Sequence, residues 1–152
     1  IIIDNHHLKY LFGKVTMYPH FNRKARNMIL YFLKRHFNDP DQLVIPLDPA
    51  QIDINQEEMR KIFRGWRYRD NYKILSREVR NLGENIPPLI NAYMGLSPTM
   101  RTFGTFINHK FGDVEETGIM ITLRDIYVEK INRHLASYKK DFLITWFSHE
   151  NQ

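Results

Sequence analysis

The stretch from Asn85 to Ile126, NIPPLINAYMGLSPTMRTFGTFINHKFGDVEETGIMITLRDI, carries the strongest strand signal of this 152-residue chain. Within it, Ile119, Ile121 and Leu123 alternate with Met120 and Thr122. This period of two predicts a strand that buries one face, because successive side chains of a strand point to opposite sides. The stretch therefore places β-structure late in the chain.

A second strand and a helix are predicted near the start of the chain. Residues 9–17, KYLFGKVTM, alternate and are apolar on both faces, which is typical of a central strand. Asn22 can cap the helix that follows, where apolar residues recur at helical spacing until Asn38-Asp39-Pro40 ends it. A strand, a turn and an amphipathic helix indicate an α+β fold built in α/β-type layers.

Three further helices are predicted from their end signals. Asn55 can cap the first of them, and Gly65 is placed to follow its last turn. The next helix spans about 70–82, and the last is expected to begin at a cap on Asp125 and to reach Tyr138.

Composition and charge limit the classes of protein that fit. Hydrophobic residues make up 43% and charged residues 26%, so we expect one ordinary globular domain over residues 1–138, followed by a tail over 139–152. Cysteine is absent, which excludes disulfides and thiolate chemistry and fits a cytoplasmic location. The net charge of +5 favours an acidic partner.

Several catalytic motifs are missing from the sequence. It has no GxGxxG, no Walker-type loop and no GxSxG elbow. Its seven histidines show no metal-ligand spacing, and His6-His7 is interpreted as a solvated pair. We therefore predict no metal site and no bound cofactor.

Two adjacent carboxylates, Glu115 and Glu116, lead into the best strand and are the candidate catalytic residues. Neighbouring residues of a strand point to opposite faces, so at most one of the two faces a given pocket. They are either the solvated beginning of a strand or functional residues, acting as a general base or orienting an amine.

A basic segment within residues 60–80 is the strongest charge feature. Its candidate partner-binding residues are Arg60, Lys61, Arg64, Arg67 and Arg69, the run continues through Lys73, Arg77 and Arg80, and Trp66, Tyr68 and Tyr72 are interleaved. A solvated helical surface, nucleic-acid binding through stacked aromatics and docking of an acidic carrier protein all fit this pattern. The charges alone do not decide among them.

Two segments carry a family resemblance. LFGKVTMYPHFNRKAR, residues 11–26, and NIPPLINAYMGLSPTMRTFGTFINHKFGDVEETGIMIT, residues 85–122, resemble the C-terminal half of a bacterial family of GNAT-like proteins. Its members are described as hemolysins and as ornithine-lipid-type N-acyltransferases, and the family is related to the autoinducer synthases. The resemblance covers about residues 8–135.

This resemblance implies a fold. It is the C-terminal part of a GNAT-like acyl-CoA N-acyltransferase fold, with a small mixed sheet that opens in a V and is flanked by helices. The strand at 9–17 would be the fifth strand of that fold, and strands near 102–107 and 115–123 would be its last two.

The resemblance also implies an activity. The family transfers a fatty acyl group from acyl carrier protein, or CoA, to the α-amine of an amino acid such as ornithine or glycine. Acyl carrier protein and the amine acceptor are then the expected partners. Asn22, Arg26 and Tyr31 are carried over as substrate-binding candidates, beside the carboxylates Glu115 and Glu116.

The chain begins at Ile1 without the upstream half of the family pattern. We therefore expect it to be inactive alone, and whether it is itself an enzyme stays open. A strand that has lost its neighbour exposes an edge, which predicts a homodimer or another covering of that edge. The tail near Trp146 could make peripheral membrane contact.

The alternative is a non-catalytic binding module. In that case residues 60–80 dock an acidic protein, nucleic acid or an anionic membrane. The acyltransferase interpretation does not expect nucleic acid.

Overall fold

The structure, a computed structural model, describes residues 8–135. Their helices and strands, in chain order, are β1 (Tyr10–Met17), α1 (Arg23–Phe37), α2 (Gln56–Ile62), α3 (Tyr68–Asn81), α4 (Pro88–Met94), β2 (Arg101–Asn108), the 3-10 turn η1 (His109–Phe111), β3 (Val114–Thr122), the 3-10 turn η2 (Leu123–Asp125) and α5 (Val128–Leu135). His6-His7, the predicted helix end at Tyr138 and the tail with Trp146 lie outside the described residues.

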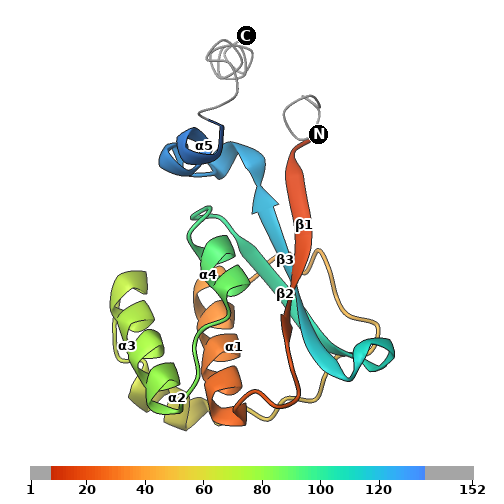
Figure 1. The fold of residues 1–152 in the computed structure, drawn as a ribbon, viewed down its shortest axis with the longest axis vertical. Helices are drawn as coiled ribbons and strands as arrows, with labels where there is room; N and C mark the ends of the chain where they lie inside the picture. Colours follow the sequence, from red (N-terminus) through yellow and green to blue (C-terminus); the bar gives the residue numbers. More distant parts are fainter. Residues whose placement is uncertain (1–7, 136–152) are drawn as a thin grey trace.

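The three strands form one sheet in the order β1-β3-β2 (Figure 1). β3 pairs antiparallel with β1 from Tyr10–Thr122 to Met17–Glu115, and it pairs antiparallel with β2 on its other side. The β2–β3 register shifts between Thr102 and Thr105, which marks a bulge. The mixed α and β fold with a small sheet and helices is confirmed.

Two details of the predicted sheet are wrong. β1 was expected to be central, but among the described residues it pairs on one side only, and β3 is the central strand. Both ladders are antiparallel, where a mixed sheet was expected, and the parallel contact is an isolated bridge between Asn38 and Thr102. Residues 9–17 are apolar on both faces partly because Phe12 packs over the same sheet: it stacks on Phe103 of β2 across Gly118 of β3, with ring centroids 5.7 Å apart.

The helices cover one face of the sheet. α1 packs with its apolar stripe against that face, and α3 lies on the far side of α1 (Figure 1). Ile29 and Phe32 on α1, together with Ile119 and Ile121 on β3, are completely buried and join the layers. Burying an aliphatic side chain of this size stabilises the fold by about 1.5–3 kcal/mol.

The predicted helix ends are confirmed in two places. The side chain of Asn22 accepts hydrogen bonds from the N–H groups of Lys24 and Ala25, and that of Asn55 accepts one from Glu58. These contacts satisfy amides that have no partner within the first turn. The two caps therefore set where α1 and α2 begin.

Three other features differ from the sequence predictions. Asp125 does not cap a helix, because it lies in η2, where its carboxylate accepts from Thr99 Oγ1 at 2.5 Å. Gly65 was expected directly after the C-cap of α2, but the C-cap is Phe63, so Gly65 lies two residues beyond it. A Cβ at Gly65 would lie 2.8 Å from Asn71 Oδ1. α4 was not predicted, although Pro88 at its first turn is a favoured position for proline.

Among residues 8–135, no helix has both the length and the apolar character that a membrane span requires.

Candidate functional site

Glu115 and Arg26 form an ion pair between the sheet and α1. Glu115 lies on the helix-covered face of β3, and Nη1 of Arg26 donates to its Oε1. The two side chains are 15% and 13% exposed, so water screens their interaction only in part. Nε and Nη2 of Arg26 donate to Asn27 Oδ1 at 3.0 and 2.8 Å, which fixes the plane of the guanidinium.

The second carboxylate oxygen of Glu115, Oε2, is buried and has no hydrogen-bond partner among the described residues. An unsatisfied buried polar atom costs about 1–3 kcal/mol, so such atoms are rare and call for an explanation. A donor brought by a substrate, such as an ammonium or amine, would satisfy this oxygen. Glu115 is therefore the carboxylate with unused acceptor capacity.

Glu116 lies on the opposite face of β3 and is 1% exposed. Both of its oxygens are occupied: Nζ of Lys14 lies 2.7 Å from Oε1 and 2.8 Å from Oε2, and Asn108 Nδ2 lies 3.3 Å from Oε2. The adjacent carboxylates thus point in opposite directions, as the alternation of a strand requires. Their environments suit different roles.

The candidate substrate-binding residues are not all brought together. The Asn22 side chain is used as the cap of α1, and its backbone N–H donates to Glu84 at 2.9 Å. Tyr31 stacks on Phe63 with ring centroids 5.4 Å apart, on the side of α1 that meets α2. Arg26 alone of the three contacts a candidate catalytic carboxylate.

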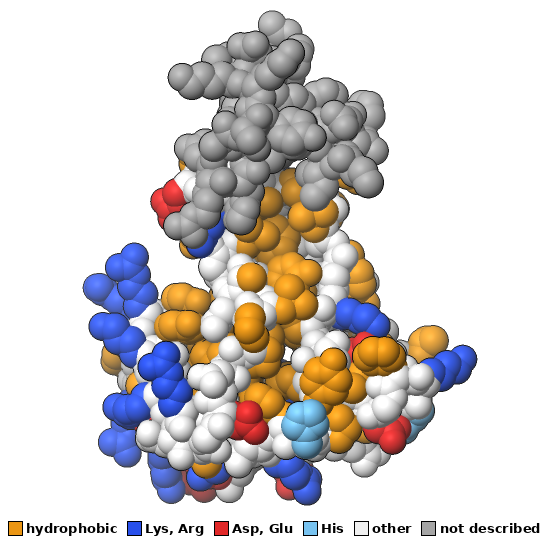
Figure 2. Space-filling view, in the orientation of Figure 1, with side chains coloured by type: hydrophobic (Ala, Val, Ile, Leu, Met, Phe, Trp, Pro, Cys, Tyr) orange, Lys and Arg blue, Asp and Glu red, His pale blue; other side chains and the backbone are white. Residues whose placement is uncertain are grey.

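The basic segment forms an exposed surface on α2, α3 and the loop between them. Figure 2 shows Lys and Arg side chains gathered over α3. All five candidate partner-binding residues are exposed, namely Arg60, Lys61, Arg64, Arg67 and Arg69. Trp66 lies among them and is 98% exposed.

The other two aromatic residues of this segment point inward. Tyr68 and Tyr72 pack against Phe32 at centroid distances of 5.5 and 6.3 Å, and Tyr72 donates to Asn91 at 2.9 Å. The pKa of Tyr68 is raised to about 12, mainly because the phenol is buried and to a lesser extent because the phenols of Tyr72 and Tyr127 lie nearby. Only Trp66 of the three is therefore placed to stack on a ligand at this surface.

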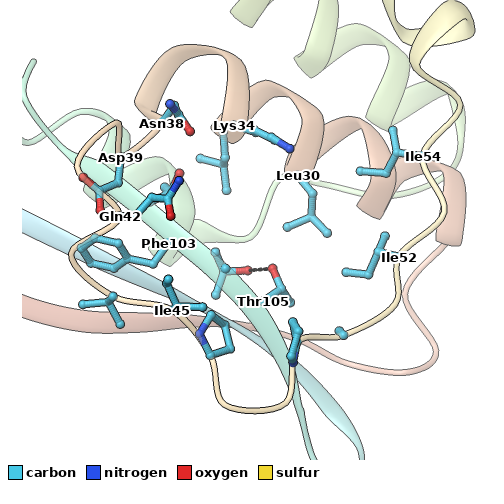
Figure 3. A pocket seen from close by; sticks show the side chains of 18 residues that line it. Leu30, Lys34, Asn38, Asp39, Gln42, Ile45, Ile52, Ile54, Phe103 and Thr105 are labelled. Carbon is cyan, nitrogen blue, oxygen red and sulfur yellow. Dashed lines mark hydrogen bonds between the residues drawn. The ribbon is translucent and has the colours of Figure 1, made fainter.

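A cavity of about 460 Å³ opens between α1, β2 and the loop that follows α1 (Figure 3). Leu30 and Lys34 border it from α1, Phe103 and Thr105 from β2, and residues 42–54 from the loop. Its volume is within the range of about 300–1,000 Å³ that is common for small-molecule sites. No local sequence pattern predicted this cavity, because its walls come from segments that are distant in the chain.

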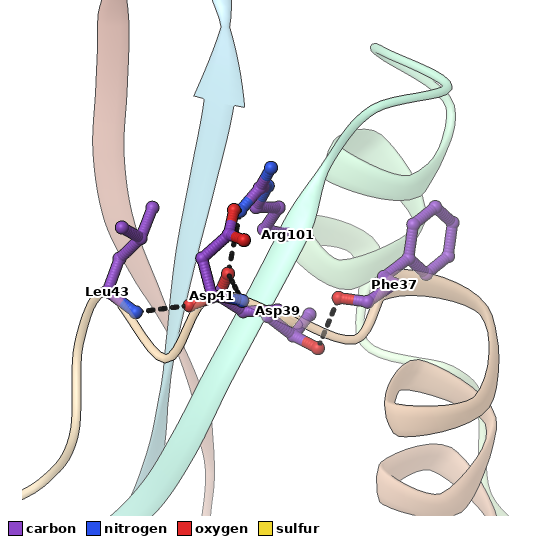
Figure 4. A network of polar contacts seen from close by, with 6 residues as sticks. Phe37, Asp39, Asp41, Leu43 and Arg101 are labelled. Atoms are coloured by element: carbon purple, nitrogen blue, oxygen red, sulfur yellow. Dashed lines mark hydrogen bonds and ion pairs between the residues drawn. The ribbon is translucent and has the colours of Figure 1, made fainter.

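A polar network around Asp39, one of the residues that line the cavity, joins the loop after α1 to β2 (Figure 4). Asp39 accepts from the N–H of Leu43 at 2.7 Å and from Arg101 Nη1 at 2.7 Å, and Arg101 also contacts Asp41. Burial raises the pKa of the Asp39 carboxyl, but these hydrogen bonds and the N–H of Asp41 outweigh it, so the pKa is lowered. Gln42 adopts a φ of 51°, a left-handed conformation that this network holds in place.

Among residues 8–135, no three His, Asp or Glu side chains converge as metal ligands would.

Comparison with known proteins gives two relatives. A glycine N(alpha)-acyltransferase of Bacteroides thetaiotaomicron is 56% identical over 131 residues, which are 86% of this chain and 39% of that protein. A glycine N(alpha)-acyltransferase of Phocaeicola vulgatus is 53% identical over 133 residues, which are 88% of this chain and 41% of that protein. The chain thus spans about two fifths of the length of the curated relatives it matches.

No family model and no solved structure matches the chain. The similarity to the two relatives supports the resemblance to N-acyltransferases, and their names specify neither a hemolysin nor an ornithine-lipid type.

Proposed function

We propose that this chain is part of an N-acyltransferase that moves a fatty acyl group from acyl carrier protein or CoA to the amine of an amino acid. The observation that carries the proposal is the similarity, above half identity over most of the chain, to two glycine N(alpha)-acyltransferases. Glycine is accordingly the first acceptor to test, and ornithine the second.

In the proposed mechanism Glu115 is the general base. Its free Oε2 takes a proton from the ammonium group of the amino acid, and the neutral amine attacks the thioester carbonyl. Backbone N–H groups stabilise the resulting oxyanion. When the tetrahedral intermediate collapses, the amide forms and the C–S bond breaks; the thiolate leaves, takes up a proton and becomes a free thiol.

Arg26 acts on Glu115 in this scheme. Because its guanidinium is committed to Glu115 and Asn27, it fixes the direction in which Oε2 points. Glu116 is assigned to the ion pair with Lys14, since neither of its oxygens is free.

The test uses a hybrid in which the matched residues of the Bacteroides thetaiotaomicron relative are replaced by those of this chain. Transfer to glycine is measured with acyl carrier protein and with CoA as donors. Glu115→Gln should lower kcat by about 10²–10⁴-fold, the usual contribution of general acid–base catalysis. Glu116→Gln is the matched control and should retain kcat in the folded protein, and unchanged turnover in Glu115→Gln would remove Glu115 from the mechanism.

The basic surface on α2 and α3 is proposed to dock the acyl carrier protein. Its exposed charges fit an acidic partner, and the inward direction of Tyr68 and Tyr72 leaves little for base stacking. Lys61→Glu should weaken salt-dependent retention on acyl carrier protein, whereas Lys110→Glu, exposed on η1, should not. Retention on nucleic acid and none on acyl carrier protein would favour a binding module instead.

A further inference from the structure

The cavity between α1 and β2 has an interior suited to an apolar ligand. Leu30 and Leu33 form its α1 wall and are 8% and 1% exposed, and Ile52 and Ile54 lie across from them (Figure 3). A wall of aliphatic side chains offers a ligand dispersion contacts and release of water, and it offers no hydrogen bond.

The polar atoms on the floor of the cavity satisfy one another. Thr105 and Thr117 face each other across β2 and β3, and their hydroxyl oxygens are 2.8 Å apart. At the far end, Asp39 is already bound by Leu43 and Arg101. The other polar side chains with long reach in the lining, those of Lys34, Asn38 and Gln42, are exposed to solvent. An alkyl chain could therefore lie against the aliphatic wall without leaving a buried donor or acceptor unpaired.

Glu115 and Arg26 do not line the cavity, but each lies on the same element as a residue that does. Arg26 precedes Leu30 by four residues of α1, so the two lie on the same side of the helix and about 6 Å apart along its axis. Glu115 precedes Thr117 by two residues of β3, on the same face and about 7 Å away. The spacing along α1 and β3 thus places both residues of the ion pair within about 7 Å, along their elements, of residues that line the cavity.

We propose that this cavity holds the alkyl chain of the acyl donor, with the reacting carbonyl at the Glu115 end and the chain terminus near Asp39. This assignment rests on the proposed acyltransferase function and adds the residues that set the preferred chain length. The ligand class is an alkyl chain, because Leu30, Leu33, Ile52 and Ile54 give the cavity an aliphatic wall.

The test narrows the cavity and measures binding apart from catalysis. Ala50 lines the cavity on the loop wall, and Ala50→Leu adds bulk there. Ala92→Leu makes the same change on the exposed side of α4, outside the cavity, and is the matched control. Binding is followed by displacement of a fluorescent fatty acid from the chain by decanoate and by hexadecanoate.

We expect Ala50→Leu to weaken hexadecanoate by about fourfold for every methylene that it excludes, and to affect decanoate less. Ala92→Leu should leave both affinities unchanged. Val44→Phe narrows the same cavity from a half-exposed position and should also weaken hexadecanoate more than decanoate. This second variant separates narrowing of the cavity from a folding defect caused by Ala50→Leu. Equal affinities in all four proteins, or no displacement at all, would overturn the assignment.

Acyl transfer by the hybrid separates this proposal from the proposed function. If transfer occurs and Ala50→Leu leaves its chain-length preference unchanged, the cavity assignment is wrong while the function stands. If the chain binds alkyl ligands in the predicted way and the hybrid transfers nothing, the cavity assignment stands and the function is wrong.

Discussion

Replacing Lys14 with methionine tests whether Glu116 is held by a buried ion pair. The Glu116 side chain is 2% exposed, and Lys14→Met would leave its carboxylate with the Asn108 amide at 3.3 Å as its remaining donor. Breaking a buried pair by removing one partner costs about 3–5 kcal/mol. Because the Lys14 side chain is 55% exposed and partly screened, we expect the free energy of unfolding to fall by about 2–3 kcal/mol.

A second ion pair provides a control with the same geometry and different burial. Lys24 Nζ lies 2.7 Å from Glu58 Oε1, the same distance as in the Lys14–Glu116 pair. Its side chains are 51% and 41% exposed, and exposed pairs contribute about 0–1 kcal/mol. Lys24→Met should therefore cost much less than Lys14→Met, since burial of the carboxylate and not contact distance sets the energy.

Urea unfolding followed by circular dichroism measures both variants. A double-mutant cycle that combines Lys14→Met with Glu116→Gln isolates the interaction energy between the two side chains, and we expect a coupling energy of about 1–2 kcal/mol. If Lys14→Met costs no more than Lys24→Met, the argument from burial fails and Glu116 has to be reconsidered as an available carboxylate.

Three further changes have defined outcomes. Asn71→Leu removes the side chain that binds the N–H and the C=O of Gly65 at 3.0 and 2.9 Å. Urea unfolding should show that the free energy of unfolding falls by about 2–3 kcal/mol. Asn81→Leu, at an exposed position of the same helix, is the control and should change it little. Asn22→Ala removes the cap of α1 and should cost about 1 kcal/mol by the same assay, whereas Asn22→Asp should retain most of the stability. The lowered pKa of Asp39 predicts that its contribution to stability is present above its ordinary pKa of 3.8 and is lost as pH falls through the folded-state value. Acid titrations of the native chain and of Asp39→Asn should therefore converge at low pH; a constant difference would contradict this.

The elements that sequence patterns predicted well are those fixed by local signals. The alternation of residues 9–17 predicted β1 to within one residue, and that of residues 119–123 placed a strand where β3 lies. The bounds near 102–107 and 115–123 came from the family resemblance and differ from those of β2 and β3 by one residue at each end. Asn22 and Asn55 cap helices because a side-chain oxygen near the first turn satisfies free amides wherever the helix later packs. Such contacts span only two or three residues, so the sequence displays them directly.

The sheet order and the site depend on contacts that local patterns do not contain. The edge position of β1 follows from its pairing with β3, more than 100 residues away in some contacts, such as Lys14 with Glu116. The Arg26–Glu115 pair joins residues 89 apart. Tyr31 was a substrate-binding candidate from the resemblance alone, and its stacking on Phe63, 32 residues later in the chain, is a contact that no local pattern contains.

The contrast between Glu115 and Glu116 gives the strongest physical reason to place chemistry at this strand. Glu116 shows that the fold can bind both oxygens of a buried carboxylate. At the preceding residue, Glu115 has a donor on one oxygen only, which is an energetic cost that a purely structural carboxylate has no reason to retain. Under the proposed function, the free oxygen would accept a proton from the substrate amine, and the energetic cost of leaving it without a donor would then serve proton transfer. If Glu115→Gln and Glu116→Gln lowered turnover equally in the hybrid, at equal folded fractions, this distinction would be lost.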